Sequence, residues 1–194
     1  MDRDPRLLVV DLNRVPAYAE AFRALYGPAG LSPQSLARAI GVFIKAEVRP
    51  GETPFDRYAT DPAALTPAAK RGMDLFAGKA RCLLCHTGAF FSDDFFHNVG
   101  LRPTPGLDDP GRGAIVKEIH SMRAFRTPPL RDVARTGPYM HDGSEKDLAS
   151  IIEFYDRGGD VRDASQDDLV KPLGLTSGER DDLLQFLHAL TSPE

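Results

Sequence analysis

The sequence predicts a mostly α-helical fold with a long loop-rich middle. Apolar residues recur at helical spacing toward both ends of the 194-residue chain. Between residues 88 and 143 this periodicity fades, and Gly and Pro become frequent. No run of alternating residues indicates a strand ladder. The expected organisation is one compact unit overall, with N-terminal helices over residues 1–50 and the main domain over residues 51–194.

The first helical segments lie before the middle of the chain. Residues 5–27 place apolar side chains at helical spacing, with Pro16 near a helix start and Gly27 at a helix end. The next helix is expected to have Ser32 as its N-cap and Pro33 at its first position. Its apolar stripe comprises Leu36, Ile40, Phe43 and Ile44.

The later helical segments flank the loop-rich middle. A Pro- and Gly-rich connection covers residues 49–62, and Thr66 is the expected N-cap of the helix that leads to the cysteines. Another helix is expected to start with Ser144 as N-cap and Asp147 as the capping-box carboxylate. Residues 175–192 give the last helix.

Composition excludes two classes of function. The net charge of −4 and the lack of a basic stripe argue against a nucleic-acid partner. No apolar run approaches the roughly 20 residues of a membrane span. The N-terminus, MDRDPRLLVV, lacks the basic flank and apolar core of a signal peptide. We therefore expect the chain to begin partway into a larger protein.

Both cysteines lie in the stretch RCLLCHTG, in the order Cys-x-x-Cys-His: Cys82, Cys85 and His86. A disulfide between residues three apart closes almost no loop and would stabilise little. A thioredoxin-like pair needs a βαβ context, and a zinc site needs four ligands, usually from a second pair; neither is visible. Covalent attachment of one haem c is the favoured interpretation, and a haem-free metal or redox site is the weaker alternative.

Haem attachment assigns a role to each residue of the motif. The thiols of Cys82 and Cys85 would bind the haem vinyl groups, and His86 would be the proximal ligand of the iron. Because bacteria attach haem c outside the cytoplasmic membrane, we expect a periplasmic protein, although this chain carries no signal peptide.

The residues around the motif indicate a family. The stretches TPFDRY, AAKRGMDLFAGKARCLLCHTGAFFSDDFFHNVGL, FRTPPLRDVARTGPYMHDGSEKDLASIIEFYDRGG and LTSGERDDLLQFLHAL follow one another in order. Together they resemble the C-terminal haem domain of the bacterial di-haem cytochrome c peroxidases and of the methylamine-utilisation protein MauG. The resemblance implies a cytochrome c-like helical haem domain, and it puts residues 1–50 at the junction with an N-terminal haem domain.

The resemblance also implies an activity and partners. In the intact family member, a peroxidase-like oxidoreductase, this domain would pass electrons to or from a second, peroxide-reacting haem. This chain has one haem motif and no Trp, whereas the family relays electrons through a Trp between two haems. The implied partners are the missing N-terminal haem domain, a small redox protein (cytochrome c or cupredoxin) or an oxidised protein substrate, and a second copy in a homodimer. The alternative is a stand-alone mono-haem electron-transfer cytochrome.

The resemblance suggests Tyr155 as the distal iron ligand, because counting from PYMHDG places it where the peroxidases have Met and MauG-like members have Tyr. The helical pattern agrees with an inward-facing Tyr155, which shares one face with Leu148, Ile151 and Ile152. A phenolate favours ferric iron and lowers the potential, which suits oxidation of a partner protein. The alternative is a core tyrosine with a hydrogen-bonded hydroxyl. The rival ligands are Met73, Met122 and Met140.

Two further pairs of residues are candidates for cofactor contacts. The resemblance implies calcium bound by the backbone carbonyls of Thr136 and Pro138, and a plain Pro turn is the alternative. Arg126 and Arg131 flank TPPL, and one of them is expected to pair with a haem propionate; a surface or loop-pinning role is the alternative.

Overall fold

The computed structural model describes residues 4–47, 51–106 and 109–193. The chain divides into two compact units, with the boundary between residues 49 and 50, and each unit is described by itself. Within the described ranges, no helix is long and apolar enough to cross a membrane.

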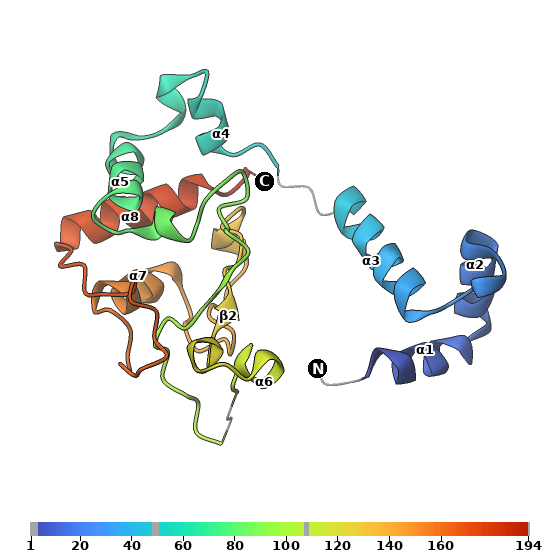
Figure 1. Ribbon diagram of the computed structural model, residues 1–194. Helices are drawn as coiled ribbons and strands as arrows, with labels where there is room; N and C mark the ends of the chain where they lie inside the picture. Colours follow the sequence, from blue (N-terminus) through green and yellow to red (C-terminus); the bar gives the residue numbers. More distant parts are fainter. Residues whose placement is uncertain (1–3, 48–50, 107–108, 194) are drawn as a thin grey trace. The chain divides into compact units, whose positions relative to one another are not determined.

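The first unit contains three α-helices in the order in which the sequence places them (Figure 1). Gly27 ends the second helix at a φ of 67°, and Pro16 occupies its first turn, both as predicted. The Ser32 hydroxyl accepts a hydrogen bond from the Ser35 backbone N–H at 3.1 Å, which confirms it as the cap of the third helix. The elements are α1 (Pro5–Asn13), α2 (Pro16–Tyr26), the 3₁₀ helix η1 (Gly27–Ala29) and α3 (Pro33–Glu47).

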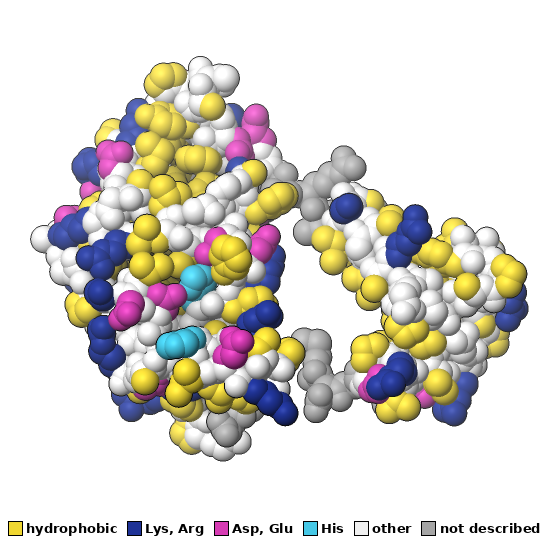
Figure 2. Space-filling model, viewed as in Figure 1, with side chains coloured by type: hydrophobic (Ala, Val, Ile, Leu, Met, Phe, Trp, Pro, Cys, Tyr) yellow, Lys and Arg dark blue, Asp and Glu magenta, His cyan; other side chains and the backbone are white. Residues whose placement is uncertain are grey.

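Much of the apolar surface of this unit is exposed. Val9 and Leu31 are its buried hydrophobic residues among those described, at 9% and 7% exposure. The side chains that Figure 2 draws in yellow over this unit include large residues from all three α-helices. The exposed large hydrophobic residues are Leu7, Leu8, Val10, Val15, Tyr18, Leu25, Ile40, Val42, Phe43 and Ile44. Three members of the stripe predicted on α3 are therefore solvent-exposed within this unit.

The second unit is built around two packed helices, α5 and α8, which lie against each other (Figure 1). Their close approach depends on Gly72, where a Cβ atom would lie 2.0 Å from the Asp182 carbonyl oxygen. The helical elements of this unit are α4 (Pro54–Tyr58), η2 (Pro62–Ala64), α5 (Pro67–Ala77), η3 (Cys82–Leu84), α6 (Gly113–Val116), η4 (Ile119–Ser121), η5 (Val133–Arg135), α7 (Leu148–Asp156) and α8 (Ser177–Ala189). A two-residue antiparallel pair, β1 (Phe96–His97) and β2 (Phe125–Arg126), lies in the long middle.

A single main hydrophobic cluster fills this unit. Phe76 of α5 packs edge-on against Phe186 of α8, with ring centroids 5.2 Å apart. The buried members are Phe76, Ala80, Phe91, Leu130, Val133, Leu148, Ile152, Leu175, Leu183, Phe186, Leu187 and Leu190. Residues from the helices and from the loop-rich middle thus share one core, which positions the segment after α5.

Two details of the predicted elements were wrong. The helix expected after Ser144 begins at Leu148, with Asp147 itself as the N-cap that accepts from the Ser150 N–H. Residues 144–146 are kept out of the helix because Glu145 pairs with Tyr139 through two backbone hydrogen bonds of 2.6 and 3.3 Å. The connection over residues 49–62 also contains a short helix, α4, that the Pro and Gly content concealed. The mostly α fold with a loop-rich middle is confirmed.

Candidate haem-attachment site

The two cysteines and His86 lie on one tight turn directly after α5. Gly78 ends the helix, and Arg81, at a φ of 57°, turns the chain into η3. The Cys82 carbonyl accepts the backbone N–H groups of Cys85 at 3.3 Å and His86 at 2.9 Å. The described chain contains no disulfide, and both cysteines are free. The turn therefore presents two thiols and one imidazole from five consecutive residues.

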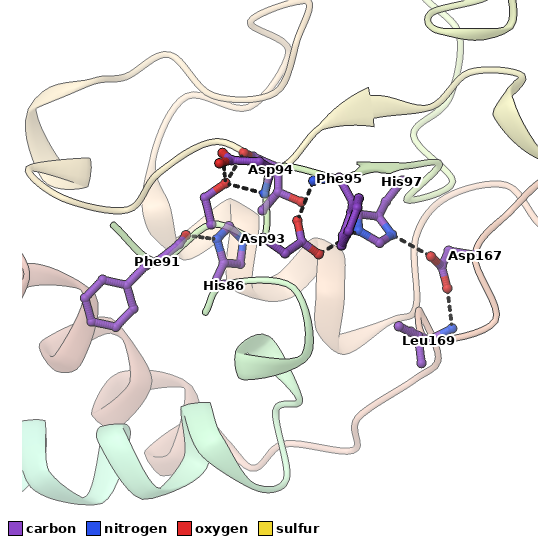
Figure 3. Close-up of polar contacts among 10 residues, drawn as sticks. His86, Phe91, Asp93, Asp94, Phe95, His97, Asp167 and Leu169 are labelled. Carbon is purple, nitrogen blue, oxygen red and sulfur yellow. Dashed lines mark hydrogen bonds and ion pairs between the residues drawn. The ribbon is translucent and has the colours of Figure 1, made fainter. Parts of the chain in front are cut away.

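The imidazole of His86 is fixed by the backbone. Its Nδ1 lies 2.7 Å from the Phe91 carbonyl oxygen, as Figure 3 shows, and must donate the proton to it. Burial lowers the pKa of His86, against the opposing effect of this bond, so the ring is neutral at pH 7. With the proton on Nδ1, Nε2 carries the lone pair of the neutral ring, and the Pro128 backbone also lies within hydrogen-bonding reach of the imidazole. This is the tautomer that a histidine needs in order to bind a metal through Nε2.

The environment of the thiols does not suit a redox pair. Burial raises the pKa of Cys82 to about 12. Burial, together with the negative charges of Asp93 and Asp167, raises the pKa of Cys85 to about 11. Reactive dithiols instead have lowered pKa values near cations or helix N-termini. These raised pKa values therefore weigh against the thioredoxin-like interpretation.

Tyr155 lies on α7, and its hydroxyl is close enough to both cysteines for their charges to act on it. Burial raises the pKa of Tyr155 well above its usual value, and negative charge at Cys82 and Cys85 would raise it further. Its ring packs edge-on against Phe154, with centroids 5.2 Å apart. Among the described residues, none hydrogen-bonds to the Tyr155 hydroxyl. The alternative of a core tyrosine with a bonded hydroxyl therefore lacks its partner, and the ligand role stays a prediction.

Two of the three rival methionines have packing partners. Met73 packs against the main core cluster. The Met122 sulfur lies where a Cβ on Gly113 would be 2.5 Å away, so it fills the space under α6. Met140 is half-buried in a turn at a φ of 66°.

Sequence analysis missed a network of charged groups next to Cys85. His97 lies between two carboxylates, with Nδ1 2.6 Å from Asp167 Oδ2 and Nε2 3.0 Å from Asp93 Oδ2 (Figure 3). A ligand atom of Cys85, one of Asp93 and one of His97 all lie within 4.8 Å of one another. Asp167 is 70 residues from His97, so no local pattern could have indicated the contact.

Both arginines that are candidates for a haem propionate contact bind other groups of the protein. Arg131 donates through Nη1 to Asp56 at 2.6 Å and through Nε to the Ala89 carbonyl at 2.8 Å. Arg126 forms an exposed ion pair with Asp94. By these bonds Arg131 holds two loop segments together, and Arg126 belongs to a surface ion pair. A propionate contact by either residue stays a prediction.

The two residues predicted for calcium lie on the surface after η5. Thr136 and Pro138 are both exposed. The Thr136 hydroxyl is used locally, because it donates to the Val133 carbonyl at 3.0 Å. Calcium binding by their own backbone carbonyls stays a prediction.

Known proteins with similar sequences decide the family. No family model matches the chain. The chain is 39% identical to methylamine utilization protein MauG of Methylorubrum extorquens (strain AM1), over 98% of this chain and 54% of that protein. It is 35% identical to cytochrome-c peroxidase IdrP1 of Pseudomonas sp. (strain SCT), over 98% of this chain and 58% of that protein. The chain belongs to the family of MauG and the di-haem cytochrome c peroxidases.

Solved structures agree with this assignment. The chain superposes with a TM-score of 0.72 on the crystal structure of a MauG-like protein associated with microbial copper homeostasis, at 32% identity. The match covers 88% of this chain and 61% of that one. The di-haem peroxidase BthA from Burkholderia thailandensis gives the same TM-score at 23% identity, which shows the shared fold. The cytochrome c-like fold class is therefore confirmed, and the chain spans a little over half the length of its curated relatives.

Proposed function

We propose that this chain is the haem c-carrying electron-transfer unit of a di-haem peroxidase or MauG-like oxidoreductase. The observation that supports this proposal most directly is a single turn that presents the free thiols of Cys82 and Cys85 beside His86. The Nδ1 atom of His86 is already bonded to the Phe91 carbonyl. Such residues suit covalent haem c with a histidine ligand. The bound group would supply a one-electron iron couple.

Each residue of the turn has a distinct task. The sulfur atoms of Cys82 and Cys85 would hold the haem through thioether bonds, with each thiol hydrogen passing to a vinyl carbon. His86 presents Nε2 to the iron, and its Nδ1–H bond to the Phe91 carbonyl holds the ring and increases its basicity. The main cluster around Phe76 and Phe91 provides the apolar surroundings that exclude water.

Tyr155 is the proposed distal ligand. Its pKa is raised, so the phenol keeps its proton at neutral pH unless a cation replaces that proton. A phenolate on the iron favours the ferric state and a low potential. That potential suits the oxidation of a partner protein, as in a MauG-like enzyme, better than the uptake of electrons from a high-potential cytochrome.

The remaining length of the relatives leaves room for a second unit. Relatives of nearly twice this length are named as cytochrome c peroxidases and as MauG. We place the peroxide-reacting haem in an N-terminal domain outside this chain, with electrons passing between the two haems. A periplasmic location, a small redox protein or oxidised protein substrate, calcium at Thr136 and Pro138, and a homodimer belong to the same proposal.

Ferric spectra test the distal ligand. We would compare the low-temperature EPR and visible spectra of the haem-loaded wild type with those of Tyr155→Phe. A phenolate-to-iron charge-transfer band that the variant loses would support the MauG-like function. Tyr58→Phe is the matched control, because this half-buried tyrosine packs on the smaller cluster around Leu65 and should leave the spectrum unchanged. If the wild type and Tyr155→Phe instead gave the same His/Met-type spectrum, Tyr155 would be rejected as the distal ligand.

Haem retention tests the cofactor itself. The wild type, matured by a c-type ligation system, should stay red after denaturation and acid–acetone extraction. The double variant Cys82→Ser/Cys85→Ser should release all of its colour. A second Cys-x-x-Cys-His upstream in the reading frame would favour the di-haem enzyme, whereas a signal peptide ending just before residue 1 would favour the stand-alone cytochrome.

A further inference from the structure

His97 is a half-buried titratable group beside the haem-attachment turn, and the proposed function gives it no task. A ring nitrogen of His97, an Asp93 oxygen and the Cys85 sulfur lie within 4.8 Å of one another. The backbones are also tied, because the Asp93 N–H donates to the Cys85 carbonyl at 2.8 Å. In the proposed haem-loaded protein this sulfur is bonded to a vinyl carbon of the haem. The imidazole therefore lies beside an atom that is covalently joined to the cofactor.

The two carboxylates define where a proton enters and leaves this ring. Nδ1 lies 2.6 Å from Asp167 Oδ2, and Nε2 lies 3.0 Å from Asp93 Oδ2 (Figure 3). A neutral imidazole has one N–H, which we assign to the shorter contact with Asp167. Nε2 then points a lone pair at a carboxylate oxygen, and a second proton turns this repulsion into a charge-assisted hydrogen bond. The exchangeable proton is therefore the one on Nε2.

The surroundings hold the network in place and favour the charged ring. The Leu169 N–H donates to Asp167 at 2.8 Å, and the Phe95 N–H donates to Asp93 at 2.9 Å. Burial lowers the pKa of His97, and the hydrogen bonds and charges of Asp167 and Asp93 more than reverse this effect. The His97 side chain is 17% exposed, so solvent protons can reach it while its charge is only partly screened.

The charge of His97 also acts on the proximal iron ligand. Burial is the main cause of the lowered pKa of His86, and among the charged groups Asp93 raises this pKa whereas His97 lowers it. An iron that gains an electron loses one positive charge, so it repels a cation at His97 less. Reduction therefore favours protonation. By linkage, protonation favours reduction to the same extent.

The charged and titratable groups around His97 come from several segments of the described chain. Two of them are carboxylates that favour the proton, and the cysteine becomes an uncharged thioether on attachment. A further pair forms a surface ion pair and adds little net charge. These groups are Asp93 from the loop before β1, Asp167 from the loop after α7, Cys85 and His86 from the haem turn, and Arg126 of β2 with its partner Asp94.

We propose that His97 takes up one proton when the haem is reduced and releases it when the haem is oxidised, with Asp93 and Asp167 holding the ring. One electron comes from a small redox protein or a chemical reductant. One proton comes from water, adds to Nε2 and completes the bond to Asp93, and no other bond forms or breaks. This inference rests on the proposed function, because it requires haem at Cys85. Its consequence is that a rising pH favours the ferric state.

The reduction potential of the haem-loaded full chain, measured from about pH 5 to about pH 10, tests the coupling. The potential should fall from an acid plateau to an alkaline plateau, with the fall above the ordinary histidine pKa of about 6.5. We expect a total fall of about 30–60 mV. This corresponds to a change of about 3- to 10-fold in the proton affinity of His97, converted at about 59 mV per tenfold for one electron.

Three variants assign the proton to this residue. His97→Gln should give one potential across the whole pH range, whereas His120→Gln, which replaces an exposed histidine, should behave as the wild type. Asp167→Asn should move the fall to lower pH, because it removes one of the two anions that favour the proton. A purely structural role of the network would not produce this displacement. A fall that persists in His97→Gln would overturn the proposal.

Proton uptake by the wild type decides the matter even where His97→Gln does not fold. Reduction in weak buffer, followed with a pH indicator, should consume protons inside the pH range of the fall and none on either plateau. Tyr155→Phe should retain the uptake, and its loss in that variant would assign the proton to the distal ligand and overturn the proposal. If haem attaches and no proton is taken up, this inference alone fails. If haem does not attach, the proposed function fails together with it.

Discussion

His97 lies between two carboxylates, and its protonation is therefore coupled to folding. Burial alone would lower the pKa of His97, but the hydrogen bonds to Asp167 and Asp93 outweigh it and raise the pKa above its usual value. A raised folded-state pKa stabilises the fold fully below the unfolded value of about 6.5. This stabilisation is lost as the pH rises through the folded-state pKa.

The first prediction concerns this pH dependence in His97→Gln. Urea unfolding in metal-free buffer should show the largest loss of stability in the variant near pH 6, where His97 is charged in both the folded and the unfolded state. The loss should be smaller near pH 9. These two pH values lie on either side of the ordinary histidine pKa of about 6.5. His120→Gln, an exposed histidine, should match the wild type at both pH values. A deficit of His97→Gln that grows with pH would contradict the assigned hydrogen bonds.

At the residue scale, the sequence could predict groups that are close in the chain. Cys82, Cys85 and His86 form a local motif, and Tyr155 could be placed by counting along a helix. The contact between His97 and Asp167 could not be predicted, because a two-residue strand and a distant loop, neither with a periodic pattern, bring these residues together. The role of Arg131 was left open for the same reason: its partners Asp56 and Ala89 lie far away in sequence.

At the element scale, the packing of α5 against α8 depends on one small residue. A Cβ at Gly72 would lie 2.0 Å from the Asp182 carbonyl oxygen and 2.8 Å from the Phe186 Cβ. Backbone cannot move aside as a flexible side chain can, so the helices would have to separate.

The second prediction follows from this contact. Gly72→Ala should lower the free energy of unfolding by about 1–3 kcal/mol or more, measured by denaturant unfolding. Gly178→Ala is the matched control, because Gly178 lies in the first turn of α8 with nothing within 4 Å of its Cβ position. That variant should be neutral or slightly stabilised, by roughly 0.5–1 kcal/mol at most. Equal effects of both substitutions would contradict close helix packing at Gly72.

Arg131 joins α4 to the segment that carries Phe91. Its Nη1 donates to Asp56 Oδ2 and to the Thr53 hydroxyl at 2.6 and 3.2 Å, and its Nε donates to the Ala89 carbonyl. The side chain is 14% exposed, and Thr53 is fully buried. Because His86 depends on the Phe91 carbonyl, this arginine supports the histidine indirectly.

The third prediction compares two arginines. Arg131→Lys should lower the free energy of unfolding by about 1–3 kcal/mol, because an ammonium group cannot replace the forked donors. Arg126→Lys should cause no measurable loss, because its ion pair with Asp94 is exposed. Both stabilities would be measured by urea unfolding of the haem-loaded protein. If Arg131→Lys instead shifted the reduction potential with no loss of stability, a propionate contact would replace the loop-pinning role.

Helices with regular apolar spacing were predictable, and their ends depended on tertiary contacts. The caps at Ser32 and Thr66 follow from local residue types, and both hydrogen bonds are present. The start of α7 was misplaced because the Tyr139–Glu145 pairing holds residues 144–146 in an extended conformation. A capping box at Thr53 and Asp56 identifies α4, but five residues give too little periodicity for a confident prediction.

At the scale of the whole molecule, the two units differ in how much apolar surface they bury. Neither hydrophobic cluster includes a described residue of the first unit. That unit instead exposes large apolar side chains on α1, α2 and α3. Three members of the apolar stripe that the sequence places on α3, Ile40, Phe43 and Ile44, are exposed within this unit.

The fourth prediction is that the second unit folds and attaches haem without the first. A chain that starts at residue 51 retains both hydrophobic clusters, the Cys-x-x-Cys-His turn and Tyr155. Its stability should therefore match that of the same unit in the full chain, with a melting temperature within about 2 °C by circular dichroism. Its ferric spectrum should also be unchanged.

The same truncation should change one surface property. Removing residues 1–50 removes the apolar side chains exposed on α1–α3, so binding of a hydrophobic fluorescent dye to the native protein should fall. If the shortened chain instead bound more dye and lost cooperative unfolding, the second unit would depend on the first for burial. Its core would then be incomplete without α1–α3, and the helices before residue 50 would have to be assigned to the same folding unit as the haem turn.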